Sequence, residues 1–159
     1  MQYLKYWRAA EAEPCLLLQD AVIDVFAKYA QVSPSAPESG GILLGHVRTP
    51  HLEILEASEP TFWDKRLRYF FDRGSRGHRE MAERRWRDSD GLVRYVGEWH
   101  THPEDYPTPS YVDRAGWIEL ANKRQDQRPV LAIVVGRKAL HIELVNRDGT
   151  NLVMHGVLA

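Results

Sequence analysis

The longest uninterrupted apolar run in the chain, Val130–Val135, is only six residues long. A helix that crosses a membrane needs about 18 or more consecutive apolar residues, so this run does not predict one. Its length and its β-branched side chains are typical of a buried strand instead. A second β-rich segment, Leu140–Asn146, follows the turn residues Gly136-Arg137-Lys138, and the two segments together predict a hairpin. The core is therefore expected to contain a sheet.

Proline, glycine and serine clusters divide the rest of the chain into short segments of both helical and strand type. Apolar residues at near-helical spacing predict a helix over Leu16–Gln31, which ends before the Ser33–Pro37 cluster. Further patterns predict strands over Gly41–Val47 and Leu52–Ala57 paired as a hairpin, a strand over Tyr69–Asp72, a helix over Ser75–Arg87 with Ser75 as its N-cap, a strand over Leu92–His102, a helix from Ser110 toward Gln125, and a last strand near Leu152–Val157. The pattern is that of a mixed α/β (α+β) fold.

Length and composition favour a single domain over residues 1–159. A chain of 159 residues with 43% hydrophobic content can enclose one sizeable core, and no repeat or composition break divides it. The segment Met1–Ala10 lacks the apolar block and cleavage site of a secretory signal, so we expect a cytoplasmic protein. Cys15 is the single cysteine. It allows no internal disulfide and no cysteine-rich zinc site, and we expect it to be a buried, inert thiol.

The net charge is nearly neutral, with 21 basic and 22 acidic residues, which argues against a nucleic-acid or membrane partner. The charge is nevertheless uneven, because arginines gather with aromatic residues between Arg66 and Arg94. Two interpretations stay open for this stretch. A local basic surface is one, and an ordinary solvated helix face balanced by nearby carboxylates is the other and the favoured one.

The most informative segment is Trp99-His100-Thr101-His102-Pro103, which ends a predicted strand. Alternate side chains of a strand point to the same face, so the two imidazoles of His100 and His102 are expected to emerge together. Asp113 lies in the first turn of the next predicted helix, and the proline-containing loop can bring that turn back over the strand end. Catalytic zinc takes three such ligands and leaves a fourth position for water. The spacing predicts a metal site of two histidines and one aspartate.

Each half of this pattern also has a simpler explanation. Two histidines on one strand face are often only polar surface, and Ser110 with Asp113 three residues later forms a capping box for the helix. The two halves in one short segment favour the metal interpretation.

At these residues the chain resembles the JAB1/MPN/Mov34 (JAMM) metalloprotease family. The motif His100-Thr-His102-Pro103, six residues, Ser110, two residues and Asp113 is similar to that of the family, and the segment Glu38–Gly45 is similar to the family's catalytic-glutamate segment. The resemblance covers about Leu16 to Val135. It is greatest to short bacterial JAB proteins of anti-phage (CBASS) or integrative-element operons. It implies a single-domain JAB/MPN-like fold in which helices flank a mixed, mostly antiparallel, curved sheet.

The resemblance also implies roles for the site residues. His100, His102 and Asp113 would hold Zn²⁺, Glu38 would be the general base, and Ser110 would stabilise the oxyanion. Strand alternation alone also nominates Glu98 as the base, because it shares a face with the two histidines. We favour Glu38 for its glycine-rich context, which allows close approach of the backbone.

The function implied is that of a zinc-dependent isopeptidase or peptidase. Such an enzyme would cut the amide bond after the C-terminus of a ubiquitin-like or nucleotidyltransferase-like protein partner, with an E1/E2-like enzyme encoded nearby, in antiviral defence. The partner's tail is expected to add to a sheet edge in a groove between Tyr69–Asp72 and Pro103–Pro109. Alternatives are a small-molecule amidase, a hydrolase that processes sulfur carriers, a non-catalytic scaffold and a DNA-associated protein. The scattered histidines His46, His51, His78, His141 and His155 lack ligand spacing and are expected to be ordinary surface or core residues.

Overall fold

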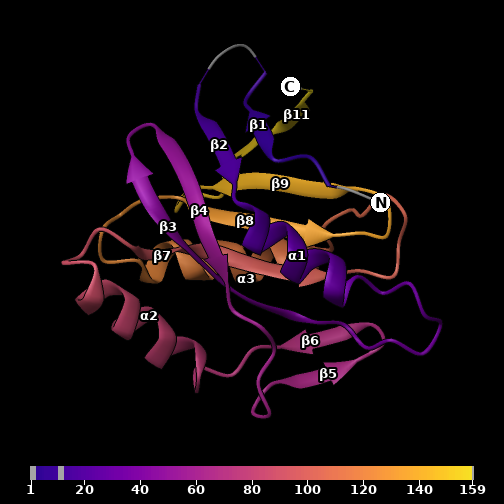
Figure 1. The fold of residues 1–159 in the computed structure, drawn as a ribbon. Helices are drawn as coiled ribbons and strands as arrows, with labels where there is room; N and C mark the ends of the chain where they lie inside the picture. The colour runs from indigo at the N-terminus through magenta and orange to yellow at the C-terminus, as the bar shows by residue number, and fades with distance from the viewer. Residues whose placement is uncertain (1–2, 11–12, 159) are drawn as a thin grey trace.

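The computed structural model describes residues 3–10 and 13–158 of the chain. A nine-stranded sheet, a two-stranded ribbon and three helices make up this part of the chain (Figure 1). The strands of the large sheet lie in the order β10 (Asn151–Val153), β9 (Leu140–Val145), β8 (Val130–Val135), β7 (Arg94–Thr101), β3 (Gly40–Arg48), β4 (His51–Ala57), β2 (Cys15–Leu18), β1 (Tyr6–Arg8) and β11 (His155–Val157). The ribbon pairs β5 (Lys65–Leu67) with β6 (Phe70–Asp72), and the helices are α1 (Asp20–Tyr29), α2 (His78–Asp88) and α3 (Tyr111–Lys123).

The sheet is mixed and mostly antiparallel, as expected. Only β7 with β8 and β2 with β4 pair in parallel among the described strands. The parallel pair β7 and β8 is joined through α3, because parallel neighbours need a crossover connection. Both predicted hairpins, β3 with β4 and β8 with β9, are confirmed.

Strand β8 separates two apolar clusters, and its six residues are all buried. Its odd-numbered residues join a large core with Val22, Ile23 and Phe26 of α1. Ala132 and Val134 of the same strand pack with Trp117 of α3. Since successive strand side chains point to opposite faces, α1 and α3 cover opposite faces of the sheet, as Figure 1 shows.

The strand that carries the two histidines is bent where two backbones approach closely. The register between β3 and β7 shifts at Leu43 and Leu44, and that between β3 and β4 shifts one residue later. A Cβ atom added at Gly97 would lie 1.8 Å from the carbonyl oxygen of Leu131 on β8. Bulges of this kind increase the local twist and bend the strand. They contribute to the curvature that the sequence analysis expected.

Several sequence predictions were wrong in their details. The segment predicted as a helix over Leu16–Gln31 begins with strand β2, and the helix proper starts only at Asp20. Helix α2 begins at His78 with Gly77 as its N-cap, so Ser75 does not cap it. A positive φ of 85° at Gly77 explains the later start, because this conformation favours glycine.

The end of the chain and the cysteine also differ from expectation. The single last strand is two strands, interrupted at Met154, which is buried and donates its N–H to the carbonyl of Ile142. Strand β5 was not predicted, because its Lys-Arg-Leu sequence carries no apolar alternation. Cys15 is exposed rather than buried. No described helix is long and apolar enough to cross a membrane.

Candidate metal centre

His100 on β7 and His102 directly after this strand converge, as strand alternation predicts. The Nε2 atoms of His100 and His102 lie 3.0 Å apart. Thr101 between them points the other way and is fully buried. The main chain is fixed on both sides here, because Thr101 donates its N–H to the Ser39 carbonyl and His102 donates its N–H to the Val135 carbonyl. The pair of imidazoles therefore rests on the rigid end of a strand.

Asp113 reaches these imidazoles from the first turn of α3. Its Oδ1 lies 3.3 Å from His100 Nε2, and its Oδ2 lies 3.3 Å from His102 Nε2. The capping box predicted at this helix is also present: Asp113 N–H donates to Ser110 Oγ at 3.1 Å, and Ser110 N–H donates to Asp113 Oδ2 at 2.7 Å. Capping and metal ligation are thus compatible, because the capping contacts orient the carboxylate toward the histidines.

The loop between strand and helix is tied to the turn between β8 and β9. Arg137 and Lys138 donate their N–H groups to the carbonyls of Glu104 and Asp105, and both side chains form ion pairs with the Asp105 carboxylate. Gly136 leaves the space for this contact, since a Cβ there would lie 2.4 Å from Pro107. These bonds fix the path by which α3 returns over the strand end.

The three side chains fit a tetrahedral metal ion. Zinc bonds of 2.0–2.1 Å to nitrogen and oxygen imply ligand atoms about 3.3 Å apart in a tetrahedron. The two Nε2 atoms lie 3.0 Å apart, and each lies 3.3 Å from a different oxygen of the Asp113 carboxylate, so the separations are near that value. His100, His102 and Asp113 are the only group among the described residues whose donor atoms come together in this way. Their side chains are 12%, 10% and 16% exposed, so a small molecule can still reach them.

In the metal-free protein, Asp113 and His102 each favour the charged form of the other. Burial would raise the pKa of Asp113, but hydrogen bonds from His100 and His102 hold the pKa of that carboxyl far below its usual range. Burial would lower the pKa of His102, but the hydrogen bond to Asp113 raises it. His102 Nδ1 is buried and lies 3.3 Å from Glu104 Oε1, without the alignment of a hydrogen bond. A carboxylate behind a histidine commonly orients that histidine as a metal ligand.

Glu38 precedes β3 and lies beside the same strand end. Gly40 pairs with His100, and the Ser39 carbonyl accepts from Thr101, so the register continued by one more step brings Glu38 opposite His102. The Glu38 side chain is buried in a polar, charged surrounding. Burial raises its pKa to about 7, with Asp113 and Glu104 adding to the rise and His102 opposing it. A carboxyl with this pKa can take up and release a proton near neutral pH.

The ribbon β5–β6 holds the Glu38 backbone. Glu38 N–H donates to the Leu67 carbonyl at 2.8 Å, Arg66 Nε donates to the Glu38 carbonyl at 3.0 Å, and an Arg66 Nη donates to Ser39 Oγ. The Phe71 ring lies where a side chain on Gly40 would stand. Sequence reasoning missed Arg66 as a site neighbour, because nothing in an arginine-rich stretch distinguishes one arginine from the next.

Glu98, the other nominated base, is engaged elsewhere. Its carboxylate accepts two hydrogen bonds from Arg73, at 2.6 and 2.8 Å, and one from Tyr95 at 2.9 Å. Burial and the neighbouring Glu98 raise the pKa of Tyr95. Both oxygens of this carboxylate are thus occupied by Arg73 and Tyr95. This geometry favours Glu38 over Glu98 as the base.

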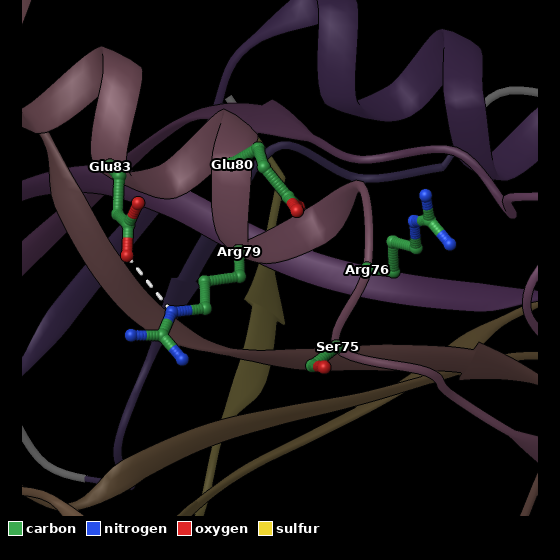
Figure 2. A pocket seen from close by; sticks show the side chains of 5 residues that line it. All are labelled: Ser75, Arg76, Arg79, Glu80 and Glu83. Atoms are coloured by element: carbon green, nitrogen blue, oxygen red, sulfur yellow. Dashed lines mark hydrogen bonds and ion pairs between the residues drawn. The ribbon is translucent and has the colours of Figure 1, made fainter.

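The arginine-rich stretch is largely occupied by internal contacts. Arg68 donates to carbonyls of the segment after α1, Arg85 pairs with Glu56, and Arg79 pairs with Glu83 along α2. Figure 2 shows the Arg79–Glu83 pair on the α2 surface, with Arg76 on the preceding segment extending separately. These pairings support the favoured interpretation of a balanced helix face.

A Ser–His–Asp chain of contacts lies where α2 meets the sheet. His78 Nδ1 lies 2.6 Å from Ser58 Oγ, and His78 Nε2 lies 2.9 Å from Asp64 Oδ2. Ser58 Oγ also accepts the N–H of Ile42, and both Ser58 and His78 are buried. No substrate can reach this serine, so we interpret the chain of contacts as an anchor that holds α2 to the sheet.

His141, on β9, instead pairs with the buried Glu143. Neither histidine belongs to the metal centre.

The chain is similar in sequence and in fold to known proteins. The family model of prokaryotic homologs of the JAB domain matches residues 20–147. A protein of Pseudomonas aeruginosa named CD-NTase/cGAS isopeptidase is 46% identical over 157 residues, which cover 99% of each chain. Proteins of the same name from Escherichia coli and Vibrio cholerae are 35% and 37% identical, each over 80% of both chains. A solution structure of a Desulfitobacterium hafniense protein is similar with a TM-score of 0.63 and 15% identity, over 90% of this chain and 91% of the other.

Proposed function

Because the chain belongs to the family of prokaryotic JAB-domain homologues, we propose that it is a zinc-dependent isopeptidase in which residues 1–159 form one catalytic domain. Its substrate would be a protein joined through its C-terminus to an amine, and the name of the relatives, CD-NTase/cGAS isopeptidase, supports a partner of that kind. We propose that the protein acts in antiviral defence. The observation that carries the proposal is the convergence of His100, His102 and Asp113. Beside them lies the Glu38 carboxyl, whose pKa is raised to about 7.

In this proposal His100, His102 and Asp113 hold the zinc. Bound zinc would supply Lewis-acid activation of a water molecule and of the scissile carbonyl. Glu38 takes the proton from the attacking water and passes it to the leaving amine as the C–N bond breaks. A pKa near 7 suits both halves of this transfer, since the group must accept and then release one proton.

Ser110 supports the oxyanion that develops on the carbonyl. Its Oγ accepts the Asp113 N–H, which leaves its own hydroxyl hydrogen available to donate. The substrate tail would lie between Tyr69–Asp72 and Pro103–Pro109, held by main-chain hydrogen bonds. The exposed side chains of Phe70 and Tyr106 would flank it.

A fusion of the cognate partner's C-terminal tail to a reporter protein tests the function. We expect cleavage after the last partner residue by the zinc-loaded protein, and at least a hundredfold slower cleavage by Glu38→Gln. Glu98→Gln is the matched control, because its carboxylate is engaged by Arg73. Equal cleavage of unrelated unfolded peptides would contradict deconjugation.

Each alternative function predicts a different set of results. A scaffold would bind the partner without cleaving it or holding zinc, and a small-molecule amidase would ignore the fusion while cutting short amides. Salt-sensitive DNA binding would favour a DNA-associated protein. The internal pairing of the arginines gives no support to that last alternative.

A further inference from the structure

Gln31 is a fully buried polar residue that lies outside the motif and just beyond the end of α1. Its amide nitrogen donates to the carbonyls of Ala36 and Arg68, both at 3.0 Å. Its amide oxygen accepts from Thr101 Oγ1 at 2.9 Å. A buried side chain with this many partners is costly to disrupt, because each partner would lose its hydrogen bond in a place where water cannot replace it.

The three partners of Gln31 belong to the three segments that surround Glu38. Ala36 lies in the segment that leads from α1 to Glu38, and Arg68 lies in the turn of the β5–β6 ribbon. Thr101 lies on β7 between His100 and His102. Figure 1 shows the segment after α1 running beside the ribbon before it enters β3.

Thr101 extends the network directly to the residue after Glu38. Its Oγ1 accepts the Ser39 N–H at 2.9 Å while it donates its own hydrogen to Gln31. Its backbone N–H donates to the Ser39 carbonyl at 2.8 Å. Both peptide groups of Ser39 are thereby fixed to the strand that carries the two histidines.

We propose that Gln31 and Thr101 are positioning residues that set the distance between the Glu38 carboxyl and the metal centre. This inference rests on the proposed function. The contact chain runs from Glu38 through Ser39 and Thr101 to Gln31, and Gln31 secures the other end of the same segment at Ala36. The Glu38 segment has no helix or strand of its own before Gly40, so these side-chain bonds and the contacts of β5 fix its position.

Two substitutions of Thr101 separate the effect of its hydroxyl group from the effect of its shape. Thr101→Val keeps the shape of the side chain and removes the hydroxyl, which leaves the Ser39 N–H and the Gln31 oxygen without their partner. Thr101→Ser keeps the hydroxyl and removes only a methyl group. The two variants therefore form a matched pair in which only one breaks the network.

For zinc-loaded protein and the fusion substrate, we expect Thr101→Val to lower kcat about tenfold or more with little change in KM. A displaced base weakens the transition state without weakening binding of the tail. Thr101→Ser should retain kcat within about threefold, and metal analysis should find the same zinc content in both variants. Gln31→Glu, which replaces the two amide donors with an acceptor facing two carbonyls, should also lower kcat, by about tenfold or more.

Amide hydrogen exchange of the metal-free protein gives a readout that does not depend on activity. In Thr101→Val and Gln31→Glu, exchange at the Ser39 and Glu38 amides should become about tenfold faster, while exchange in α3 stays unchanged. Unchanged kcat and unchanged Ser39 exchange in both variants would overturn the proposal. A fall in kcat that is fully explained by a lower zinc content would also overturn the proposal. Gln31 and Thr101 would then act by holding the metal ligands and not by holding Glu38.

Failure of the proposed function has a different signature. If the unmodified, zinc-loaded protein does not cleave the fusion, the isopeptidase assignment fails, and the exchange measurement alone decides the role of Gln31. If Gln31→Glu fails to fold, the Thr101→Val and Thr101→Ser pair decides it by both readouts.

Discussion

Replacing Glu38 with glutamine should stabilise the metal-free protein, and the stabilisation should depend on pH. Burial raises the pKa of this carboxyl in the folded state to about 7, from an ordinary value of about 4.5. The folded state therefore disfavours the ionised form, whereas the unfolded chain carries that charge in water. The contribution of Glu38 to stability is fully present below about pH 4.5 and is lost as the pH rises to about 7.

The size of the effect follows from the two pKa values. A difference of about 2.5 between them, at about 1.4 kcal/mol for each tenfold change in affinity for the proton, gives about 3.5 kcal/mol above pH 8. Water that enters beside the site lowers this figure, so about 3.5 kcal/mol is an upper limit. The glutamine side chain of the Glu38→Gln variant carries no charge. This variant should therefore not lose the free energy that the buried, ionised carboxylate costs above pH 8.

Denaturant unfolding in the presence of a chelator, at pH 4.5, 6, 7 and 8, measures this difference. The free energy of unfolding of Glu38→Gln should match that of the unmodified protein at about pH 4.5 and exceed it progressively toward pH 8. Asp113→Asn provides a control of opposite sign, because the pKa of Asp113 is lowered and its charge stabilises the fold at neutral pH. A difference for Glu38→Gln that is constant across this range would refute the reasoning.

Three further predictions concern the metal and the fold. Purified protein should hold about one zinc per chain, and the His100→Ala, His102→Ala double variant should hold none by metal analysis; zinc that persists there would contradict the ligand assignment. Gly97→Ala should lower the free energy of unfolding by about 3 kcal/mol or more, because its Cβ would overlap a backbone carbonyl, whereas Gly116→Ala in the open middle of α3 should raise it by about 0.5–1 kcal/mol. His78→Ala should destabilise by about 2–4 kcal/mol in thermal or denaturant unfolding, since the buried side chains of Ser58 and Asp64 each lose a hydrogen bond and the imidazole leaves a cavity; a neutral result would mean that this network does not anchor α2.

The convergence of His100, His102 and Asp113 could be predicted from the sequence, because it depends on local geometry. Strand alternation alone brings His100 and His102 together, and a helix N-terminus with a capping box determines where the Asp113 carboxylate points. The choice between Glu38 and Glu98 could not be made from spacing. It depends on Arg73, which lies 25 positions from Glu98 and engages that carboxylate only in the folded chain.

The errors in the fold have a common physical origin. The apolar residues of β2 are equally compatible with the first turn of a helix, and only pairing with β4 across a long sequence separation distinguishes the two. The polar strand β5 exists because β6 and Glu38 bind its backbone, which no local pattern reveals. Gln31 was missed for the same reason, since a single glutamine after a helix gives no local signal of its three partners.

The two short strands on either side of Met154 have a mechanical consequence. Strand β10 pairs with β9 at one end of the nine-strand order, and β11 pairs with β1 at the other, so one residue links both margins of the sheet. Met154 holds this connection in place, because its side chain is buried and its N–H donates to the Ile142 carbonyl. Cleaving the backbone there would allow both margins to fray at once and expose unpaired N–H and C=O groups on β9 and β1. Each exposed margin could then template pairing with another chain, so a nick at this single position would favour self-association more than a nick in any surface loop.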